Sequence, residues 1–444
     1  MKYKISLLII LAIATMLSLY SCSKDENSHS TINTSSSPNI IFIIADDMGW
    51  DVYGKYPGIS GIKATTPTLD SLARTGITFT NFWSSPVCAP TRASILTGKY
   101  GFRTGVGGVQ TPSTAVLQSN ETIIQKYIND KTVNKYATAI IGKWHVSAAN
   151  QLDAPESFGV GYYSGIFTGG VPSYTNWTQT SGGKQQNNTT YTTTHLVNQS
   201  VSWIQQQTKP FFLWLAFNAP HTPFHRPPLN LITDQTLSDN QASINSNPFP
   251  YYLASIEAMD KEIARLIKSL TAAQKENTVF VFIGDNGTPT QVAQTPYKTI
   301  GSKGTLYQGG INSPLLISGK NITRKNTVEN AMVQGPDLFT TFADITGASS
   351  ANYQDGISLK PLFTNANASK RTFAYSEQFG QSSPNSDGYT IRNINYKLIH
   401  LENNSEKLYN LSIDPFEEKN LLQTTLTTEA QQNLDELRKI KASL

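Results

Sequence analysis

Uninterrupted runs of apolar residues recur along the chain, and several of them end directly in polar side chains. The first run, from Asn39 to Ala45, has no polar residue after its first position. A short apolar run without alternation is typical of a strand that is buried on both faces. The strands predicted from such runs and from β-forming residues span 39–45, 78–83, 137–142, 211–217, 278–284 and 313–318. We therefore expect a sheet that is covered on both sides.

Helical segments separate these predicted strands. Pro67 stands at the start of one helix and Gly76 follows its end, which is the usual asymmetry of helix boundaries. Another helix carries apolar residues at helical spacing between Leu253 and Ile267. The predicted helices span 67–74, 90–96, 192–206, 251–272 and 337–346. Strands that alternate with helices predict an α/β fold with a mostly parallel mixed sheet flanked by helices.

The pattern changes after Gly347. The elements predicted beyond it are strands within 371–377 and 388–401, turn residues in 406–421, and a helix over 428–443. They predict a smaller α+β subdomain, a small antiparallel sheet with one helix, at residues 371–444. The main domain then occupies residues 39–370. Within it, residues 173–194 are poor in aliphatic side chains and are expected to form a long polar loop.

The beginning of the chain has the features of an export signal. Lys2 and Lys4 precede an uncharged run of 15 residues that ends at Leu19, which is short for a membrane span and typical of a signal peptide. We assign residues 1–21 to this signal. The residues that lead to Cys22 resemble the lipobox of bacterial lipoproteins, which implies a lipid on Cys22; an ordinary secretion signal is the alternative.

Residues 22–38 are rich in Ser, Asn and Thr and predict a flexible tether. The expected protein is therefore exported, periplasmic or at the cell surface, with membrane contact only through a lipid anchor at Cys22. Its formal net charge is +4, from 35 Lys and Arg against 31 Asp and Glu in 444 residues. Because nucleic-acid binding requires clustered Lys and Arg, and the sequence has no basic run, we expect no nucleic-acid partner.

Polar side chains follow four of the predicted strands at the point where each strand ends. They are Asp46 and Asp47, Lys143 and His145, His221, and Asp285 and Asn286. In open α/β sheets, ligands bind at the carboxyl ends of the strands. We therefore expect four separate elements to place these side chains around one crevice.

Four of these residues are candidate metal ligands: Asp46, Asp47, Asp285 and Asn286. Their side-chain oxygens favour Ca²⁺, or Mg²⁺ with more bound water, and Ca²⁺ is the ion we expect. Zinc is disfavoured because softer or imidazole ligands would then be expected. Asp and Asn also end strands and begin turns without binding anything, so for one pair alone the structural explanation stays open.

Cys88 is the only cysteine of the predicted folded body, because Cys22 lies just after the leader, at the start of the predicted tether. It stands just ahead of a predicted helix and four residues before Arg92. A helix dipole and a nearby cation are the surroundings that favour a reactive thiol. A free cysteine is also often a small buried residue. The run from Cys88 to Arg92 alone does not decide between a reactive position and a packing residue.

Five further side chains are candidates for binding or proton transfer. Lys143 and His145 supply a cation and a titratable base two residues apart. His221 lies in a proline-rich turn that would fix its ring, and nearby His225 is a candidate for substrate binding at the entrance. Lys303 lies in a glycine-containing loop that suits an anion, or it is an ordinary solvated lysine.

Together these residues resemble the sulfatase family of the alkaline phosphatase superfamily. The segments that carry the resemblance are Asn39–Asp47, Cys88–Arg92 with Leu96–Gly98, Gly142–His145, Ala219–His221, Asp285–Gly287 and Lys303–Gly304. They stand in the family's order, and residues 396–415 resemble its C-terminal subdomain. The resemblance thus covers nearly the whole mature chain. One departure is Thr91, where the family more often has Ser.

In that family the cysteine is oxidised by a maturation enzyme to formylglycine, an aldehyde that hydrates to a gem-diol. The resemblance implies that Cys88 is the precursor of this group, and that position 88 is both the nucleophile and a metal ligand. It also implies that the oxygen-donor residues at the ends of the strands hold Ca²⁺. A sulfate ester is a compact anion, and a divalent cation stabilises the charge that moves toward its leaving oxygen.

The resemblance also implies roles for the remaining polar residues. Arg92 and Lys143 would stabilise the deprotonated diol. His145 would take a proton from the second hydroxyl, so that the sulfated intermediate collapses and releases sulfate. His221 and Lys303 would bind the sulfate oxygens and protonate the leaving alcohol.

We therefore expect a sulfuric ester hydrolase that acts on sulfated polysaccharide or oligosaccharide and depends on a formylglycine-generating maturation enzyme. Aromatic residues are candidates either for stacking on sugar rings or for packing, and they are Tyr162, Tyr163, Tyr174, Trp177 and Phe224. Two alternative functions stay open. One is a phosphodiesterase or phosphonate monoester hydrolase of the same superfamily. The other is a non-catalytic glycan-binding surface lipoprotein.

Overall fold

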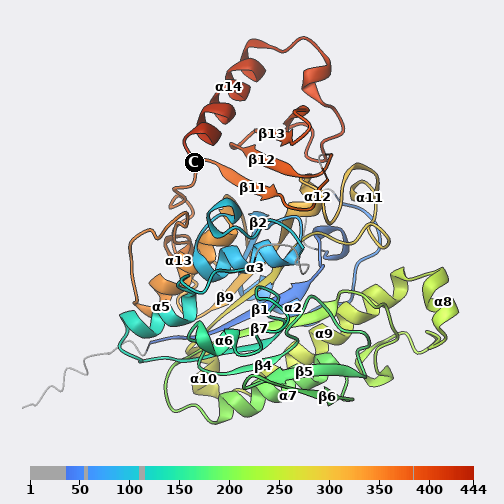
Figure 1. Ribbon diagram of the computed structural model, residues 1–444, viewed down its shortest axis with the longest axis vertical. Helices are drawn as coiled ribbons and strands as arrows, with labels where there is room; N and C mark the ends of the chain where they lie inside the picture. Colours follow the sequence, from blue (N-terminus) through green and yellow to red (C-terminus); the bar gives the residue numbers. More distant parts are fainter. Residues whose placement is uncertain (1–36, 55–58, 110–115, 384) are drawn as a thin grey trace, which may run out of the picture. The chain divides into compact units, whose positions relative to one another are not determined.

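The computed structural model describes residues 37–54, 59–109, 116–383 and 385–444. The predicted signal peptide, Cys22 and most of the predicted tether therefore lie outside the described residues. A ten-stranded mixed sheet forms the centre of the described chain, and helices cover both of its faces (Figure 1). The expected α/β fold is thus confirmed. No helix among the described residues combines the length and the apolar content needed to cross a bilayer.

Four parallel strands lie side by side at the centre of this sheet. From edge to edge the strands are β10 (Thr327–Gln334), β2 (Gly76–Trp83), β9 (Asn312–Gly319), β8 (Thr278–Gly284), β1 (Asn39–Asp46), β7 (Phe211–Pro220), β3 (Ala137–Gly142), β4 (Tyr163–Gly165), β5 (Trp177–Ser181) and β6 (Lys184–Asn188). Neighbours within the group β8, β1, β7 and β3 are all parallel. β9 runs antiparallel to both β8 and β2. The carboxyl ends of the four central strands therefore meet at one edge.

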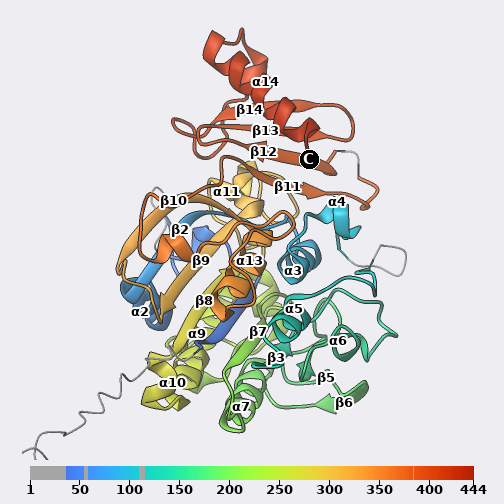
Figure 2. The same ribbon diagram turned by 90° about the vertical axis from the view of Figure 1, so that its left-hand side faces the viewer.

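Alternate side chains of β1 enter two separate hydrophobic cores. Ile41 and Ile43 pack in one core and Ile40, Phe42 and Ile44 in the other. The helices of the first core are α2 (Pro67–Thr75), α7 (Thr192–Gln205) and α9 (Phe249–Ser269). The helices of the second are α3 (Cys88–Thr97), α5 (Ile124–Lys131) and α13 (Gly335–Thr346). Figure 2 shows these two helical layers on either side of the strands. Burial on both faces explains the uninterrupted apolar sequence of β1.

Short helices connect the larger elements. They are α4 (Gly101–Thr104), α6 (Ala154–Ser157), α8 (Gln241–Ser246), α10 (Ala272–Glu276), α11 (Tyr297–Ile300) and α12 (Gln308–Ile311), with 3-10 turns η1 (Trp50–Val52), η2 (Leu229–Leu231), η3 (Lys360–Phe363) and η4 (Leu421–Gln423). The helix predicted over residues 251–272 is α9, which ends at Ser269 because Leu270 is extended, and Thr271 then caps the separate helix α10. The Thr271 side chain accepts from the backbone N–H of Gln274, and the Gln274 side chain bonds back to Thr271.

The predicted polar loop at residues 173–194 is wrong, since it contains the hairpin of β5 and β6. Gly182 and Gly183 form the turn, with φ angles of 56° and 67°. A two-residue glycine turn between β strands is the sequence signal for a hairpin. The polar side chains of the hairpin bond to each other, as when Gln186 Nε2 donates to Gln179 Oε1 at 3.2 Å. Polar pairing across strands therefore replaces the aliphatic residues whose absence suggested a loop.

A second sheet follows near the C-terminal end and is antiparallel throughout. Its strands are β11 (Ala374–Gln378), β12 (Gly388–Arg392), β13 (Tyr396–Leu401) and β14 (Glu406–Asn410), and α14 (Thr428–Ala442) packs on it. The sheet and α14 lie at the top of Figure 1. The expected small antiparallel sheet with one helix is thus confirmed. Contacts group residues 37–444 into one compact unit, and the domain boundary at residue 371 stays a prediction.

Candidate active site

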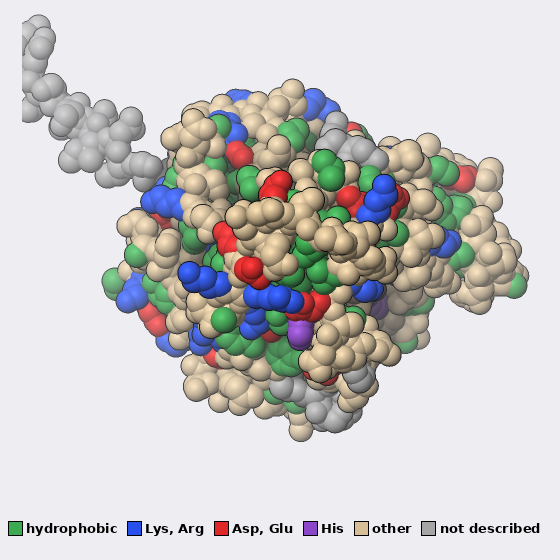
Figure 3. Space-filling model, turned by 90° about the horizontal axis from the view of Figure 1, so that it is seen from above, with side chains coloured by type: hydrophobic (Ala, Val, Ile, Leu, Met, Phe, Trp, Pro, Cys, Tyr) green, Lys and Arg blue, Asp and Glu red, His purple; other side chains and the backbone are tan. Residues whose placement is uncertain are grey.

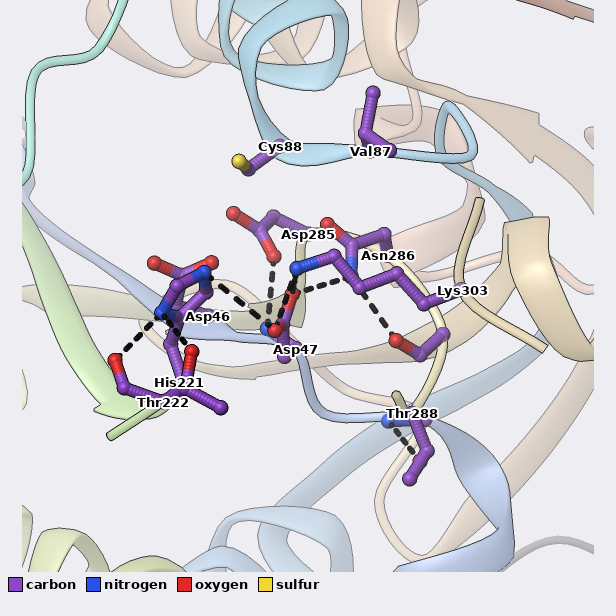
Figure 4. A network of polar contacts seen from close by, with 12 residues as sticks. Asp46, Asp47, Val87, Cys88, His221, Thr222, Asp285, Asn286, Thr288 and Lys303 are labelled. Carbon is purple, nitrogen blue, oxygen red and sulfur yellow. Dashed lines mark hydrogen bonds and ion pairs between the residues drawn. The ribbon is translucent and has the colours of Figure 1, made fainter. Parts of the chain in front are cut away.

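The carboxyl ends of the four central strands bring the predicted polar side chains to one place. They are Asp46 and Asp47 at β1, Lys143 and His145 after β3, His221 after β7, and Asp285 and Asn286 after β8. All except His221 are buried. In Figure 4 the aspartates lie below Cys88, which begins helix α3. Because this edge gathers acids, cations and imidazoles from four strands, it is the candidate active site.

Cys88 contacts both a base and a cation. Its Sγ lies 3.2 Å from Nδ1 of His145 and 3.3 Å from Nζ of Lys143. The side chain is buried, and burial raises the pKa of the Cys88 thiol although Lys143 acts in the opposite direction. The two interpretations that the sequence left open are therefore compatible, because Cys88 is buried and also lies in a chemically active setting.

Two cations pair with two of the carboxylates. Nζ of Lys143 donates to Oδ2 of Asp46 at 2.6 Å, and Nη2 of Arg92 donates to Oδ2 of Asp285 at 2.6 Å. Nη1 of Arg92 also donates to the backbone oxygen of Lys143 at 2.9 Å. Arg92 therefore fixes the ends of β8 and β3, whereas Lys143 contacts the sulfur of Cys88 directly.

Lys303 reaches the same crevice from a loop, so it is not an ordinary solvated lysine. Its Nζ donates to Oδ2 of Asp47 at 2.6 Å. The backbone N–H of Lys303 donates to Thr288 at 3.1 Å, and Gly304 donates to Pro86 at 2.9 Å, so the loop is attached on both sides. Burial alone would lower the pKa of Lys303, but Asp47 raises it above the usual range. The side chain therefore holds its positive charge at the mouth of the crevice.

The carboxylates repel one another across short distances. Burial would raise the pKa of Asp46, but Lys143 and, more weakly, His221 bring it below its usual range. Burial and the charge of Asp46 raise the pKa of Asp285 to about 6, despite the contact with Arg92. Burial and the neighbouring Asp46 thus push Asp285 toward protonation. A divalent cation between them would relieve this repulsion.

Two buried oxygens in the crevice have no hydrogen-bond partner, Asp46 Oδ1 and Asn286 Oδ1. The Asn286 amide is oriented because its Nδ2 donates to Oδ1 of Asp47 at 2.8 Å. Ligand atoms of Asp46, Cys88 and Asp285 lie within 4.8 Å of one another. Since a buried oxygen without a partner costs free energy, these residues fit a divalent cation coordinated by oxygen atoms.

His145, whose ring contacts Cys88, is held in an unusual backbone conformation. Its φ angle is 59°, in the left-handed region that non-glycine residues adopt rarely. Gly142 has a φ angle of 113°, and a Cβ atom there would lie 1.8 Å from a backbone oxygen of β7. A Cβ atom on Gly169 would lie 2.7 Å from Nε2 of His145. Burial and the charge of Lys143 lower the pKa of His145 well below its usual range, so the ring is a neutral base.

His221 is positioned by two residues whose role sequence reasoning missed. The Tyr174 hydroxyl lies 2.7 Å from the backbone oxygen of His221 and 2.9 Å from that of Asn218, and it accepts from Nδ2 of Asn218 at 3.0 Å. Nδ1 of His221 bonds to the backbone oxygen of Thr222 at 2.8 Å. Nε2 therefore faces the crevice, 3.8 Å from Oδ2 of Asp47. Tyr174 lies in the predicted polar loop, and no local pattern connects it with His221.

His225 packs against aromatic residues beside the crevice. Its ring stacks on Tyr174 with a centroid distance of 3.8 Å, and Nε2 lies 3.0 Å from the hydroxyl of Tyr191. Nδ1 lies 3.1 Å from the backbone oxygen of Pro223. Burial lowers the pKa of His225 to about 4, so the ring is neutral at ordinary pH. Both ring nitrogens thus have protein partners, and substrate binding by His225 stays a prediction.

Most of the aromatic candidates for sugar stacking are packing residues. Tyr163, Trp177 and Phe224 are buried in the two hydrophobic cores. The Tyr162 hydroxyl donates to Oε1 of Gln199 at 2.9 Å. These four side chains are therefore engaged in packing or in contacts within the protein.

Thr91 has a structural role beneath Cys88. Its hydroxyl donates to the backbone oxygen of Asp285 at 2.7 Å and accepts from the N–H of Ser85 at 2.8 Å. These bonds join the start of α3 to the end of β8. A serine hydroxyl could form the same bonds. The presence of Thr at position 91, where the family more often has Ser, therefore keeps the connection between α3 and β8.

Comparison with known proteins supports the resemblance to sulfatases that the sequence motifs indicated. Residues 38–348 match the sulfatase family, and residues 300–443 match the C-terminal part of N-sulphoglucosamine sulphohydrolase. Arylsulfatase J of Mus musculus is 28% identical over 341 residues, which cover 72% of this chain and 54% of that protein. The ulvan-active sulfatase of Formosa agariphila is 23% identical over 436 residues, covering 87% of this chain and 76% of that protein. The chain thus spans about half the length of arylsulfatase J.

Among solved structures, Ps i-CgsB in complex with k-i-k-neocarrahexaose has a TM-score of 0.76 and 24% identity to this chain. The alignment covers 91% of this chain and 92% of that one, so the fold is shared. The family match at residues 38–348 includes every strand that supplies a polar side chain to the crevice. The chain therefore belongs to the sulfatase family of enzymes.

Proposed function

We propose that this protein is a sulfuric ester hydrolase whose nucleophile is derived from Cys88. The observation that carries the proposal is the position of the Cys88 sulfur. It lies 3.3 Å from Lys143 and 3.2 Å from His145, and close enough to Asp46 and Asp285 to share a cation with them. A charged site of this kind suits a substrate that is itself a compact anion.

Two groups supplied after synthesis complete this proposal. Formylglycine made from Cys88 would supply a hydrated aldehyde as the attacking hydroxyl, and bound Ca²⁺ would supply positive charge beside it. Asp46, Asp47, Asp285 and Asn286 would hold the ion. We propose Ca²⁺ rather than Mg²⁺ because three carboxylates and an amide suit the larger coordination number of Ca²⁺.

The protein's own residues would stabilise charge, accept a proton and position the carboxylates. Lys143 holds positive charge next to position 88 and stabilises negative charge that develops there. His145, neutral because its pKa is lowered, accepts a proton at the nitrogen that faces position 88. Arg92 keeps Asp285 and the end of β3 in place.

Two side chains at the mouth of the crevice are suited to contact the substrate. His221 and Lys303 are each 20% exposed, whereas Asp47 beneath them is 2% exposed. Lys303 is a fixed cation for sulfate oxygens. His221 turns Nε2 toward the crevice, where it can give a proton to the leaving alcohol.

The proposed substrate class is sulfated polysaccharide or its oligosaccharides. The ulvan-active sulfatase among the relatives and the neighbouring structure that holds k-i-k-neocarrahexaose support this class. Sulfate release from a panel of sulfated glycans, measured beside small aryl sulfates, tests it. Turnover confined to the aryl sulfates would contradict a glycan substrate.

Mass spectrometry of the peptide that contains Cys88 tests the nucleophile directly. Protein from a host able to mature sulfatases should carry an aldehyde at this position, whereas an unmodified thiol in active protein would contradict the mechanism. The Cys88→Ala variant should lose turnover of aryl sulfate while it retains its fold. Cys22→Ala is the matched control, because it removes the other cysteine and should leave turnover unchanged.

The reaction type is tested with paired aryl sulfate and aryl phosphate substrates. We expect the sulfate ester to be the better substrate, because the proposed site holds a single divalent ion, whereas many phosphatases use a pair of metal ions. Phosphate turnover that is orders of magnitude faster would favour the phosphodiesterase or phosphonate hydrolase alternative. Glycan binding without turnover, in protein that carries formylglycine, would favour the non-catalytic alternative.

We further propose that the protein is exported and anchored by a lipid on Cys22, at the periplasmic face or the cell surface. The signal-like residues 1–21 and the tether that follows support this location. Cell fractionation of the natural protein and of Cys22→Ala tests the anchor. The variant should move from the membrane fraction to the soluble exported fraction, and an unchanged distribution would contradict the lipid anchor.

A further inference from the structure

A groove lies at the opposite edge of the sheet from the crevice. It has a volume of about 700 Å³ and is formed by α2, the end of α9, α10, the start of β8 and the end of β9. Leu72, Ile267 and Phe280 provide an apolar floor. Phe280 lies in β8, five residues before Asp285, which follows the strand, and a strand rises about 3.3 Å per residue. The groove is therefore separate from the crevice.

All the charged residues that line this groove are cations. They are Arg74, Lys268, Lys275 and Lys325, and all four are exposed. None of them forms one of the ion pairs found among the described residues. The face of the protein seen in Figure 3 is different, because its Lys and Arg side chains are interspersed with Asp and Glu. A groove with cations alone is thus a local feature.

Helix dipoles account for part of this arrangement but not for all of it. Arg74, Lys268 and Lys275 stand in the last turns of α2, α9 and α10, where a cation is favoured. Lys325, however, lies in a loop before β10 and has no helix end to stabilise. The helix dipoles explain one cation at each helix end. They do not explain why all four cations line the same groove.

The buried acid Asp260 contacts the start of α2, whose residues line the groove, but it is not itself a lining residue. Its carboxylate accepts from the backbone N–H groups of Thr68 and Leu69 at the start of α2, at 3.0 and 2.8 Å. The groove also offers hydroxyl groups, since Thr75 Oγ1 and Ser318 Oγ lie 2.8 Å apart on its wall. Its lining thus combines cations, hydroxyls and apolar side chains.

We propose that this groove is a second, non-catalytic binding site for a sulfated oligosaccharide segment of the substrate polymer. The proposal rests on the function proposed above. Lys and Arg would pair with sulfate groups, and the apolar floor would contact the C–H faces of the sugar rings. Because the groove and the crevice lie at opposite edges of the sheet, one long chain or two chains could occupy both sites at once.

The concave shape favours a polymer chain over a flat anionic membrane. A bilayer surface would meet the exposed cations at the rim and leave Leu72 and Phe280 uncovered below. A linear chain of sugar rings can enter the hollow and cover them. Binding of the groove to an anionic membrane is therefore the alternative that the experiment has to exclude.

The test compares two triple variants with equal loss of charge. Lys268→Glu, Lys275→Glu and Lys325→Glu change the groove, and Lys135→Glu, Lys184→Glu and Lys439→Glu change exposed lysines elsewhere. Both sets are made in the Cys88→Ala background, which prevents turnover. Binding of dextran sulfate, with unsulfated dextran as the neutral probe, is measured by titration calorimetry in excess aryl sulfate that occupies the crevice.

We expect the groove variant to bind dextran sulfate roughly tenfold more weakly, since three exposed ion pairs are together worth about that factor. The control variant should bind almost as well as the parent. Equal losses in both variants, no loss in either, or equal binding of unsulfated dextran would overturn the proposal. Loss of binding to phosphatidylglycerol vesicles with dextran sulfate binding retained would also overturn it, in favour of a membrane-facing groove.

Turnover of small aryl sulfates separates this proposal from the proposed function. The groove substitutions, placed in the otherwise natural protein, should leave that turnover unchanged because none of these side chains touches the crevice. Absence of turnover in matured natural protein would contradict the proposed function, whereas intact turnover with unaffected dextran sulfate binding would contradict the groove alone.

Discussion

At the scale of single residues, burial and charge decide which groups in the crevice carry a proton. Burial alone would lower the pKa of Lys143, but Asp46 raises it above its usual range, so Lys143 stays a cation. Two positions further along, burial and the charge of Lys143 both lower the pKa of His145. The short segment after β3 therefore presents a fixed positive charge and a neutral base side by side. This is the division of roles that the proposed reaction requires.

The Tyr174 hydroxyl should act on the reaction by positioning His221. In Tyr174→Phe, the backbone oxygen of His221 loses a bond, and we expect kcat to fall on the order of tenfold. Tyr162→Phe is the control, because it removes a hydroxyl that donates to Gln199, which is not one of the crevice residues. Steady-state kinetics and urea unfolding of both variants check the prediction. Equal kcat values in the two variants would contradict the positioning role.

At the scale of elements, the strand ends concentrate acid groups that no single strand could hold together. β1 and β8 are neighbours in parallel register, so Ala45 lies beside Gly284 and the acids that follow both strands converge. The N–H of Asp47 donates to Oδ1 of Asp285 at 3.1 Å. Asp46 Oδ1 and Asn286 Oδ1 have no hydrogen-bond partner among the described residues, and the proposed cation would satisfy both oxygens.

Addition of Ca²⁺ to chelator-treated protein should therefore raise its free energy of unfolding. At a free concentration of 100 times Kd, linkage predicts a gain of about 2.7 kcal/mol. Asn286→Ala should lose most of this gain, because it removes an oxygen ligand without a change in charge, whereas Asn187→Ala on the exposed hairpin should keep it. Urea unfolding with and without Ca²⁺ measures the gain. Equal gains in both variants would contradict the assigned ligand set.

At the scale of the whole molecule, a buried ion pair attaches the C-terminal sheet to the main body. Nζ of Lys397 on β13 lies 2.5 Å from Oε1 of Glu417, and it lies 5.1 Å above the ring of Trp83 at the end of β2. Oε2 of Glu417 accepts from the N–H of Gln308, the first residue of α12. This helix follows the loop of Lys303, so the C-terminal sheet supports a loop that reaches the crevice.

Removal of one partner of this pair should destabilise the protein strongly. Lys397→Met leaves Glu417 buried without a counter-charge, and we expect a loss of roughly 3–5 kcal/mol of unfolding free energy. The double variant with Glu417→Gln should recover most of that loss. The exposed pair of Lys126 and Asp130 is the control, since Lys126→Met should cost less than about 1 kcal/mol. Urea unfolding gives the unfolding free energies of the natural protein, Lys397→Met, the double variant and Lys126→Met. Equal losses for Lys397→Met and Lys126→Met would contradict the stabilising role of the buried ion pair.

The same pair predicts a pH dependence with a definite sign. Burial lowers the pKa of Lys397 from 10.5 to about 8, and it also raises the pKa of Glu417, so burial outweighs their attraction. Between about pH 8 and 10.5 the unfolded chain retains the lysine proton that the folded protein has lost, so this group makes stability rise with pH. Relative to the double variant, the natural protein should gain up to roughly 3 kcal/mol across this range. If the difference in unfolding free energy between the natural protein and the double variant did not change with pH, the lowered pKa of Lys397 would be contradicted.

Much of the main sheet was predictable because its strands are locally encoded. Residues 137–142 and 278–284 form β3 and β8 with the predicted bounds, since a strand buried on both faces is apolar throughout. The hairpin of β5 and β6 was missed although Gly182 and Gly183 signal its turn. Strand β10 was missed because Glu329 and Asn330 interrupt its apolar pattern. Tyr174 had no local signal, since its role depends on contact with His221.

The sequence by itself determined which elements form, in what order, and which side chains follow the strands, because these properties depend on residues close together in the chain. It also determined the family, through motifs in a fixed order. Only the tertiary structure decided that Lys303 pairs with Asp47, 256 residues away. Only the tertiary structure decided that Asp285 is pushed toward protonation and that four cations surround one groove. These features depend on distance and burial, which exist only once the chain has folded.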